Sequence, residues 1–214
     1  MITAANKRVA HARPRLACLL VALTIVTGLA HAGPEPARGM LLVASPDMRG
    51  TWFARSVILL IQHDESGTAG LLINRQTDIT PAELLPGVGG LNRLRHKLYI
   101  GGPVAGRGIT MLVESEAPPD RAQHVFADVY ASGNEQLLLE IADRGEAAQR
   151  IRLYAGYAGW VPGQLEAEIR RGSWTVMPAA ATLVFSTAPG DLWEHLVPAA
   201  RAIIVRRHDE SARL

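Results

Sequence analysis

The chain has 214 residues, of which 48% are hydrophobic and 20% are charged. This length and composition are typical of a globular protein with one sizeable core and argue against intrinsic disorder. The formal net charge is +2, so overall charge alone singles out no class of partner.

The first 32 residues have the order of a secretory signal peptide. Four basic residues precede an uncharged stretch from Leu16 to Ala30, and Ala30-His31-Ala32 supplies small residues at a cleavage spacing. The stretch is shorter than the ~20 residues of a membrane span. We therefore expect cleavage before Gly33 and a periplasmic or secreted protein with no stable membrane span. A buried N-terminal helix, an uncleaved anchor and a misassigned start at Met40 remain alternatives; a Met40 start would make the protein cytoplasmic.

Removal of this leader changes the chemistry of the chain. It leaves 18 basic residues against 20 acidic ones, a net charge of −2, with Lys97 as the only lysine. A basic footprint for nucleic acid is therefore missing, and nucleic acid is an unlikely partner. The only cysteine, Cys18, lies in the leader, so the mature chain has no disulfide and no thiolate.

Short apolar runs bounded by turn residues predict strands along the rest of the chain. In order, they lie at 40–44, 56–62, 69–74, 97–100, 109–114, 125–131, 151–156, 173–177 and 181–187. The second and third surround a short turn and predict a hairpin. Because most of these runs are continuously apolar, we expect a sheet covered on both faces.

Helices are predicted between these strands. Thr80-Pro81-Ala82-Glu83 is a capping box that begins a short helix, and further helices are expected at 134–145, from Pro162 to Gly172 and at 191–204. No linker divides the chain. The prediction is one α/β (α+β) domain at 39–205 with a mixed sheet covered by helices, after a polar lead-in at 33–38 and before a polar tail at 206–214.

Two glycine-rich stretches raise the question of a ligand site. Glycines at 156, 159 and 163 follow a predicted strand, but their spacing matches neither a dinucleotide fingerprint nor a phosphate loop. This favours a strand-to-helix corner in which Tyr157 and Trp160 pack as anchors, with a ligand role left open. Gly101-Gly102-Pro103 is a second corner, which either turns a strand or offers N–H groups to a ligand.

Catalytic and metal-binding patterns are sparse. His63, which follows a predicted strand, is the best acid–base candidate, with Ser45 or Asp47 as its partner, but the chain lacks a G-x-S-x-G elbow. The histidines show no metal-ligand spacing. We therefore predict no metal, no cofactor and no catalytic residue.

Several motifs together resemble the YqgE/AlgH family of bacterial proteins. They are Phe53-Ala54-Arg55-Ser56-Val57, His63, Gly67 with Gly70, Asn74, Gly101-Gly102-Pro103, Gly156-Tyr157-Ala158-Gly159-Trp160 and Gly163-Gln164-Leu165-Glu166. The resemblance covers about residues 39–197. It implies a compact α/β fold with a mixed sheet, unlike a dinucleotide-binding fold, and a function that is not established. The AlgH branch carries the label of a transcriptional regulator.

Two features depart from the family pattern. Asn74-Arg75-Gln76 stands where the family has Asn-Lys-Pro, and the export signal contrasts with family members that are usually cytoplasmic.

The leading hypothesis is a non-enzymatic accessory domain that binds a small ligand or a protein. The candidate surface is formed by Arg55, His63, Asn74, Gly101, Gly102, Tyr157, Trp160 and Gln164. Two alternatives stay open: a transcriptional regulator, if the chain starts at Met40 in the cytoplasm, and a hydrolase that uses His63.

Overall fold

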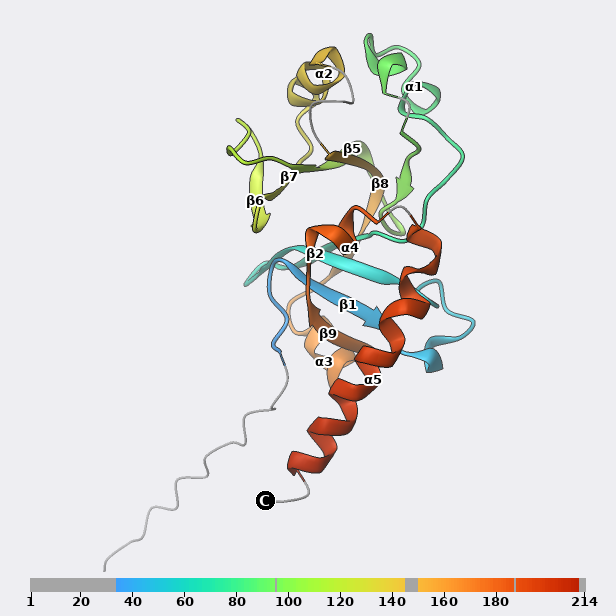
Figure 1. Ribbon diagram of the computed structural model, residues 1–214, viewed down its shortest axis with the longest axis vertical. Helices are drawn as coiled ribbons and strands as arrows, with labels where there is room; N and C mark the ends of the chain where they lie inside the picture. Colours follow the sequence, from blue (N-terminus) through green and yellow to red (C-terminus); the bar gives the residue numbers. More distant parts are fainter. Residues whose placement is uncertain (1–33, 95, 145–149, 187, 212–214) are drawn as a thin grey trace, which may run out of the picture. The chain divides into compact units, whose positions relative to one another are not determined.

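The computed structural model describes residues 34–94, 96–144, 150–186 and 188–211, and in these ranges the chain forms one curled sheet with helices packed on it (Figure 1). The strand order is β6-β7-β5-β8-β3-β2-β1-β9, every pair in this path is antiparallel, and β4 adds to β8 in parallel. The strands are β1 (Met40–Ala44), β2 (Val57–Asp64), β3 (Gly67–Leu72), β4 (Tyr99–Ile100), β5 (Val104–Glu114), β6 (Gln123–Phe126), β7 (Val129–Ser132), β8 (Arg150–Trp160) and β9 (Trp174–Pro178).

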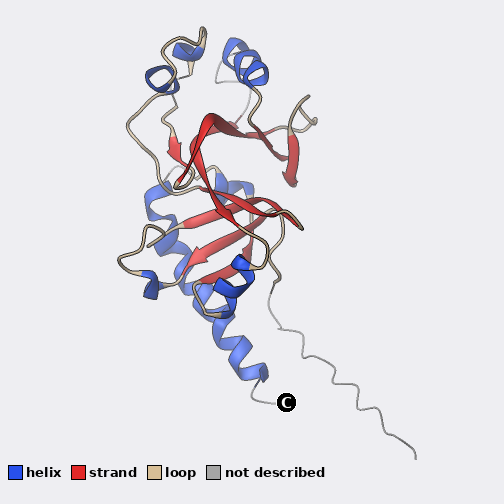
Figure 2. Cartoon of the chain, turned by 180° about the vertical axis from the view of Figure 1, so that it is seen from behind, coloured by secondary structure: helices blue, strands red, loops and turns tan. Residues whose placement is uncertain are grey.

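Helices cover the sheet from several sides (Figure 2). They are α1 (Pro81–Leu84), α2 (Glu135–Arg144), α3 (Gln164–Arg170), α4 (Ala181–Val184) and α5 (Leu192–Ser211), with 3-10 turns η1 (Pro46–Met48), η2 (Leu91–Arg93) and η4 (Pro189–Asp191). No helix in the described part of the chain is long and apolar enough to cross a membrane. The prediction of an α/β domain with a helix-covered sheet is confirmed, and the antiparallel strand order is unlike a dinucleotide-binding fold.

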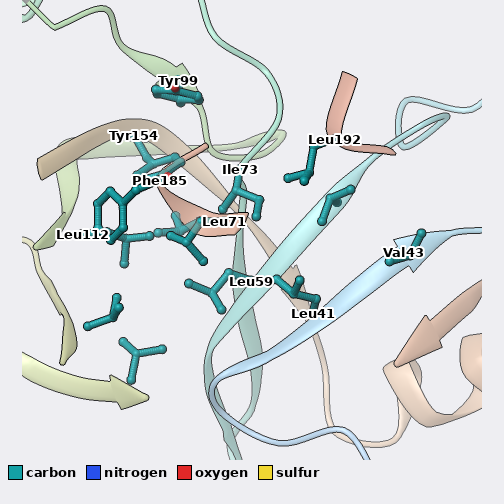
Figure 3. Close-up of a cluster of buried hydrophobic side chains, with 14 of the residues drawn as sticks. Leu41, Val43, Leu59, Leu71, Ile73, Tyr99, Leu112, Tyr154, Phe185 and Leu192 are labelled. Atoms are coloured by element: carbon teal, nitrogen blue, oxygen red, sulfur yellow. The ribbon is translucent and has the colours of Figure 1, made fainter. Parts of the chain in front are cut away.

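The core consists of three clusters separated by the sheet. The largest lies inside the curl, where leucines of β1, β2 and β3 meet Leu112, Tyr154 and Phe185 together with side chains of α5 (Figure 3). A second cluster lies between α3 and the opposite face of β1, β2 and β3, and includes Trp160 and Trp174. The third packs α2 and η2 onto β5 and β8.

The glycine-rich stretch lies within β8, which is the strand shared by all three clusters. Leu153 packs in the α2 cluster, Tyr154 inside the curl and Trp160 under α3. Gly156 has a φ of 71° where the strand changes its contacts, and side chains are rarely tolerated in that conformation. The strand-to-helix corner predicted over glycines 156, 159 and 163 therefore begins later than expected: the strand continues through Gly156 and Gly159 as far as Trp160, and the turn into α3 follows at residues 161–163.

Other boundaries also differ from the sequence prediction. The run at 125–131 is two strands, β6 and β7, joined by a turn in which Ala127 has a φ of 42°. The run at 181–187, expected as a strand, begins with α4 instead, because its apolar residues Val184 and Phe185 pack on the core as part of a helical turn. The final helix extends into the tail predicted from residue 206 and ends at Ser211.

Local signals of turn and cap were accurate. The β2–β3 hairpin forms as predicted, with His63 opposite Thr68. Thr80 caps α1, and both hydrogen bonds of the predicted capping box with Glu83 are present. Gly145, the last residue of the helix predicted at 134–145, lies outside the described residues.

Candidate functional site

The structure separates the predicted site residues into three places. Arg55 and Asn74 lie where β2 begins and β3 ends, whereas His63 lies at the other end of the same hairpin. The distance along β2 from Val57 to His63 is roughly 20 Å at the rise of an extended strand. Trp160 and Gln164 lie at the His63 end, and the glycine pair with Tyr157 lies between, along β8. The eight residues do not form one continuous surface.

Asn74 is a brace for the loop that precedes β2. Its side chain is 9% exposed, its Oδ1 accepts a hydrogen bond from the backbone N–H of Val57 at 2.9 Å, and its Nδ2 donates to the carbonyl of Arg55 at 2.9 Å. Arg55 itself has a φ of 56°, in the left-handed region that residues other than glycine rarely adopt. The amide therefore holds a strained backbone in place.

Arg75, one of the two residues that depart from the family pattern at this point, supports the same loop from its other side. Its guanidinium donates to the carbonyls of Trp52 and Ala54 at 2.5 and 3.4 Å and to the hydroxyl of Ser56 at 3.3 Å. It also lies 4.4 Å from the centre of the Trp52 ring. Burial lowers the pKa of Arg75. A planar guanidinium can both stack and make several hydrogen bonds, which a lysine cannot do.

Trp52 and Arg55 of this loop, residues 49–56, face solvent, as do the smaller Thr51 and the neighbouring Arg49. Trp52 is 42% exposed, although Arg75 covers one face of its ring and Phe53 contacts it edge to face at 5.0 Å. The Arg55 side chain is 67% exposed, forms an ion pair with Glu194 of α5 and lies 5.3 Å from the centre of the Trp193 ring. The loop is thus a fixed platform that presents an aromatic ring and a cation.

His63 is held between a hydroxyl and a carboxylate. Its Nδ1 lies 2.8 Å from Oγ1 of Thr68, and its Nε2 lies 3.6 Å from Oε1 of Glu166 in α3. Oε2 of Glu166 is buried and has no hydrogen-bond partner among the described residues. Thr68 is 8% exposed, so its hydroxyl is largely screened from solvent. The arrangement is suited to fixing the imidazole ring.

The predicted pairing of His63 with Ser45 or Asp47 was wrong. Antiparallel pairing of β1 with β2 places Val43 opposite Val57, so Ser45 lies at the end of β2 far from His63. There the Ser45 hydroxyl accepts a hydrogen bond from the N–H of Asp47 at 3.3 Å and caps η1.

Trp160 and Gln164 meet at the carboxylate of Glu168. The indole N–H groups of Trp160 and Trp174 donate to Oε2 of Glu168 at 2.9 and 2.8 Å, and Nε2 of Gln164 donates to Oε1 at 3.0 Å. Phe53 stacks on Trp160 with ring centres 6.2 Å apart. Trp160 is therefore a packing anchor, as the sequence suggested.

The glycine pair at 101–102 is used for close backbone packing. The N–H of Gly101 donates to the carbonyl of Ala155 at 2.8 Å, and its own carbonyl accepts from the N–H of Leu72 at 2.9 Å. A Cβ atom on Gly102 would overlap the backbone of Tyr157. Tyr157, predicted as a packing anchor, is instead 37% exposed and its ring lies against Gly159. It stands opposite Val104 of β5.

Sequence reasoning missed Trp52, Arg75, Thr68 and Glu168. Thr68 could have been found, because the predicted hairpin already placed it near His63. Trp52 and Arg75 meet only because the loop folds back over the end of β3, which no local pattern encodes. Among the described residues, no group of three or more histidine, aspartate or glutamate side chains is placed to hold a metal ion.

These features define a single-domain α/β protein with a curled antiparallel sheet and a braced loop before its second strand. Comparison with known proteins gives the family: the model described as AlgH-like matches residues 41–202, and the chain belongs to this family. A UPF0301 protein of Methylococcus capsulatus is 36% identical over 165 residues, covering 76% of this chain and 90% of its own length. A UPF0301 protein of Corynebacterium glutamicum is 35% identical, with coverages of 74% and 85%.

Solved structures agree with this assignment. A crystal structure of a Corynebacterium diphtheriae protein matches with a TM-score of 0.64 and 32% identity, covering 77% of this chain and 87% of its own. The solution structure of the AlgH protein from Pseudomonas aeruginosa matches with a TM-score of 0.62 and 28% identity, with coverages of 80% and 92%.

Proposed function

We propose that the chain is a non-enzymatic binding domain that contacts a protein partner through the 49–56 loop. The observation that carries this proposal is the combination of exposure and bracing: Trp52 and Arg55 face solvent, while Asn74 and Arg75 fix the backbone that presents them.

Physical arguments on binding support this role. Tryptophan and arginine are enriched at the centres of protein interfaces, where they contribute most of the binding energy. A loop that is already held in one conformation loses little entropy when a partner binds. The strained backbone of Arg55, at a φ of 56°, is the kind of local cost that is retained where it serves a site.

The same reasoning makes the His63 end the weaker candidate. The two ring nitrogens of His63 already face Thr68 and Glu166, and the indole of Trp160 is bonded to Glu168. The His63 side chain is also only 24% exposed and Trp160 5%, whereas the Arg55 side chain is 67% exposed and Trp52 42%. We therefore place the partner at the loop rather than at this end of the hairpin.

Recovery of bound proteins tests the proposal. A tagged mature chain is purified from cells that naturally make it, as wild type, as Arg55→Glu and as Val161→Ser, a control that alters a residue 68% exposed on another segment. We expect a component that the wild type and the control retain and Arg55→Glu loses. That component should bind purified wild type at least tenfold more tightly than Arg55→Glu. Equal recovery with all three chains would contradict the proposal.

We further propose that the domain acts outside the cytoplasm. The support is the order of basic, uncharged and small residues in positions 1–32. Sequencing the N-terminus of the protein from fractionated cells tests this directly: a start at Gly33 in the periplasmic fraction is expected. A start at Met40 in the cytoplasm would overturn it and favour a regulator of the AlgH type.

A further inference from the structure

Arg152 of β8 is a buried cation whose direct contacts are all with neutral groups. It is 7% exposed and lies on the side of the strand that faces the interior of the curl. Its guanidinium donates to the carbonyl of Ile73 at 3.4 Å and to that of Ser186. It also lies 4.6 Å from the centre of the Tyr99 ring and 6.0 Å from that of Phe185. Carbonyl groups and ring faces stabilise the charge without neutralising it.

A charge in this position ordinarily has a counter-ion. Buried charges in proteins are paired or bound to ions, because their removal from water is costly. Among the described residues, no carboxylate forms an ion pair with Arg152. A guanidinium also carries five N–H donors, and the two carbonyl contacts use only part of that capacity. Arg152 therefore has both charge and donors to spare.

A second unsatisfied donor lies beside it. The Tyr154 side chain is completely buried; its hydroxyl lies beside the Arg152 guanidinium, which can only donate, and the hydroxyl's own proton has no acceptor among the described residues. Burial raises the pKa of Tyr154, an effect that the positive charge of Arg152 and a side-chain hydrogen bond with it only partly oppose, so the phenol keeps its proton. The Tyr99 and Tyr154 rings are 5.3 Å apart, and both lie at the Phe185 side of the core cluster (Figure 3).

We propose that Arg152 and Tyr154 form an internal binding site for a monoanionic carboxylate whose apolar part contacts Tyr99 and Phe185. One guanidinium supplies one positive charge and can bind the two oxygens of a carboxylate side by side. The Tyr154 hydroxyl adds a further donor. A phosphate dianion would leave negative charge uncompensated in this interior, whereas the aromatic walls suit an apolar acid.

Phe185 separates this site from the surface. Its ring centre lies 6.0 Å from the Arg152 guanidinium and 5.5 Å from that of Arg150, whose side chain is 53% exposed and pairs with Glu114 at 2.7 Å. The Phe185 ring therefore lies between the site and solvent. The site shares no side chain with the 49–56 loop, so this proposal can hold or fail independently of the proposed protein partner.

Titration of the full chain with simple anions tests the site. Sodium benzoate, sodium acetate and sodium phosphate are added at constant ionic strength, and binding is followed by calorimetry and by the unfolding temperature. We expect saturable binding of benzoate, weaker binding of acetate, and at least tenfold weaker benzoate binding by Tyr154→Phe. Arg93→Ala is the matched control: its side chain is 59% exposed and pairs with Asp143 away from the site, so this variant should bind benzoate as wild type does.

The free protein supplies a second readout. Because Tyr154→Phe removes a buried hydroxyl whose proton lacks an acceptor, the ligand-free variant should unfold at the same temperature as wild type or higher. This variant keeps the test informative even where Arg152→Met does not fold. The proposal is overturned if wild type binds no benzoate saturably, if Tyr154→Phe binds it as tightly, or if phosphate is preferred.

Discussion

Asn74 shows how one buried amide can determine the position of an exposed loop. It satisfies the N–H of Val57 and the carbonyl of Arg55, two backbone groups that no strand partner satisfies at this point. Removal of both hydrogen bonds leaves buried polar groups without partners and releases the strained backbone of Arg55.

We therefore expect Asn74→Ala to lower the free energy of unfolding by about 2 kcal/mol. Urea denaturation followed by circular dichroism measures this change. Asn92→Ala, at an exposed asparagine of η2, is the control and should change stability by less than about 0.5 kcal/mol. Equal effects of the two substitutions would show that the amide is not a brace.

Gly102, another predicted site residue, also has a structural role, because it allows two backbone segments to pack closely. An added Cβ would overlap the backbone of Tyr157, which belongs to the central strand β8 and cannot shift freely. Gly102→Ala should cost more than about 3 kcal/mol or prevent folding, whereas Gly87→Ala, with open space at its Cβ position, should be tolerated. Soluble yield and thermal unfolding distinguish the two. A stable Gly102→Ala chain would mean that this corner is looser than described.

At the scale of elements, Glu168 joins α3 to two strands. Its Oε2 accepts from the indoles of Trp160 in β8 and Trp174 in β9, both nearly fully buried. Glu168→Ala leaves two buried indole N–H donors without an acceptor. We therefore expect the free energy of unfolding to fall by roughly 2 to 4 kcal/mol and the tryptophan fluorescence to change. Glu116→Ala, in an exposed loop, is the control. Unchanged fluorescence and stability in Glu168→Ala would refute this bridge.

The capping box of α1 predicts how the stability of the protein depends on pH. Hydrogen bonds from the backbone and then the hydroxyl of Thr80 hold the pKa of Glu83 below its usual value. A carboxyl with a lowered folded-state pKa adds stability above its unfolded pKa, and this is lost as pH falls through the folded value.

Loss of the cap hydroxyl in Thr80→Ala should cost about 1 kcal/mol near neutral pH. The difference from wild type should shrink below about pH 4. Denaturation at a series of pH values measures this difference in the free energy of unfolding, with Thr182→Ala, at an exposed threonine, as the control. A difference that stays constant down to about pH 2 would contradict the role of the ionised carboxylate.

Elements with local signals were the ones that the sequence could predict. The hairpin, the capping box of Thr80 and the α2 helix follow from turn residues, caps and helical periodicity. The path of β8 could not be read in this way, because glycines that usually end a strand here permit close packing on Gly101 and Gly102. The α4 turn was missed because a short apolar run has no period long enough to separate helix from strand.

At the scale of the whole domain, the curl of the sheet decides which predicted residues meet. β8 pairs with β3 along one half and with β5 along the other, and Gly39 before β1 packs against Phe126 of β6. The α/β class was predictable from the run of elements. The separation of Arg55 from His63 was not, since it depends on the antiparallel register, and Trp52 became visible as a site residue only in the fold.

The central claim is that the 49–56 loop is the surface that binds a partner. Site-specific photo-crosslinking inside cells tests it most directly, with a photoreactive residue placed at position 52 or, as the exposed control, at position 161. We predict a discrete adduct from position 52 that excess wild-type chain suppresses and excess Arg55→Glu chain does not. The claim is contradicted if position 52 gives no adduct beyond that of position 161, or if both competitors suppress it equally.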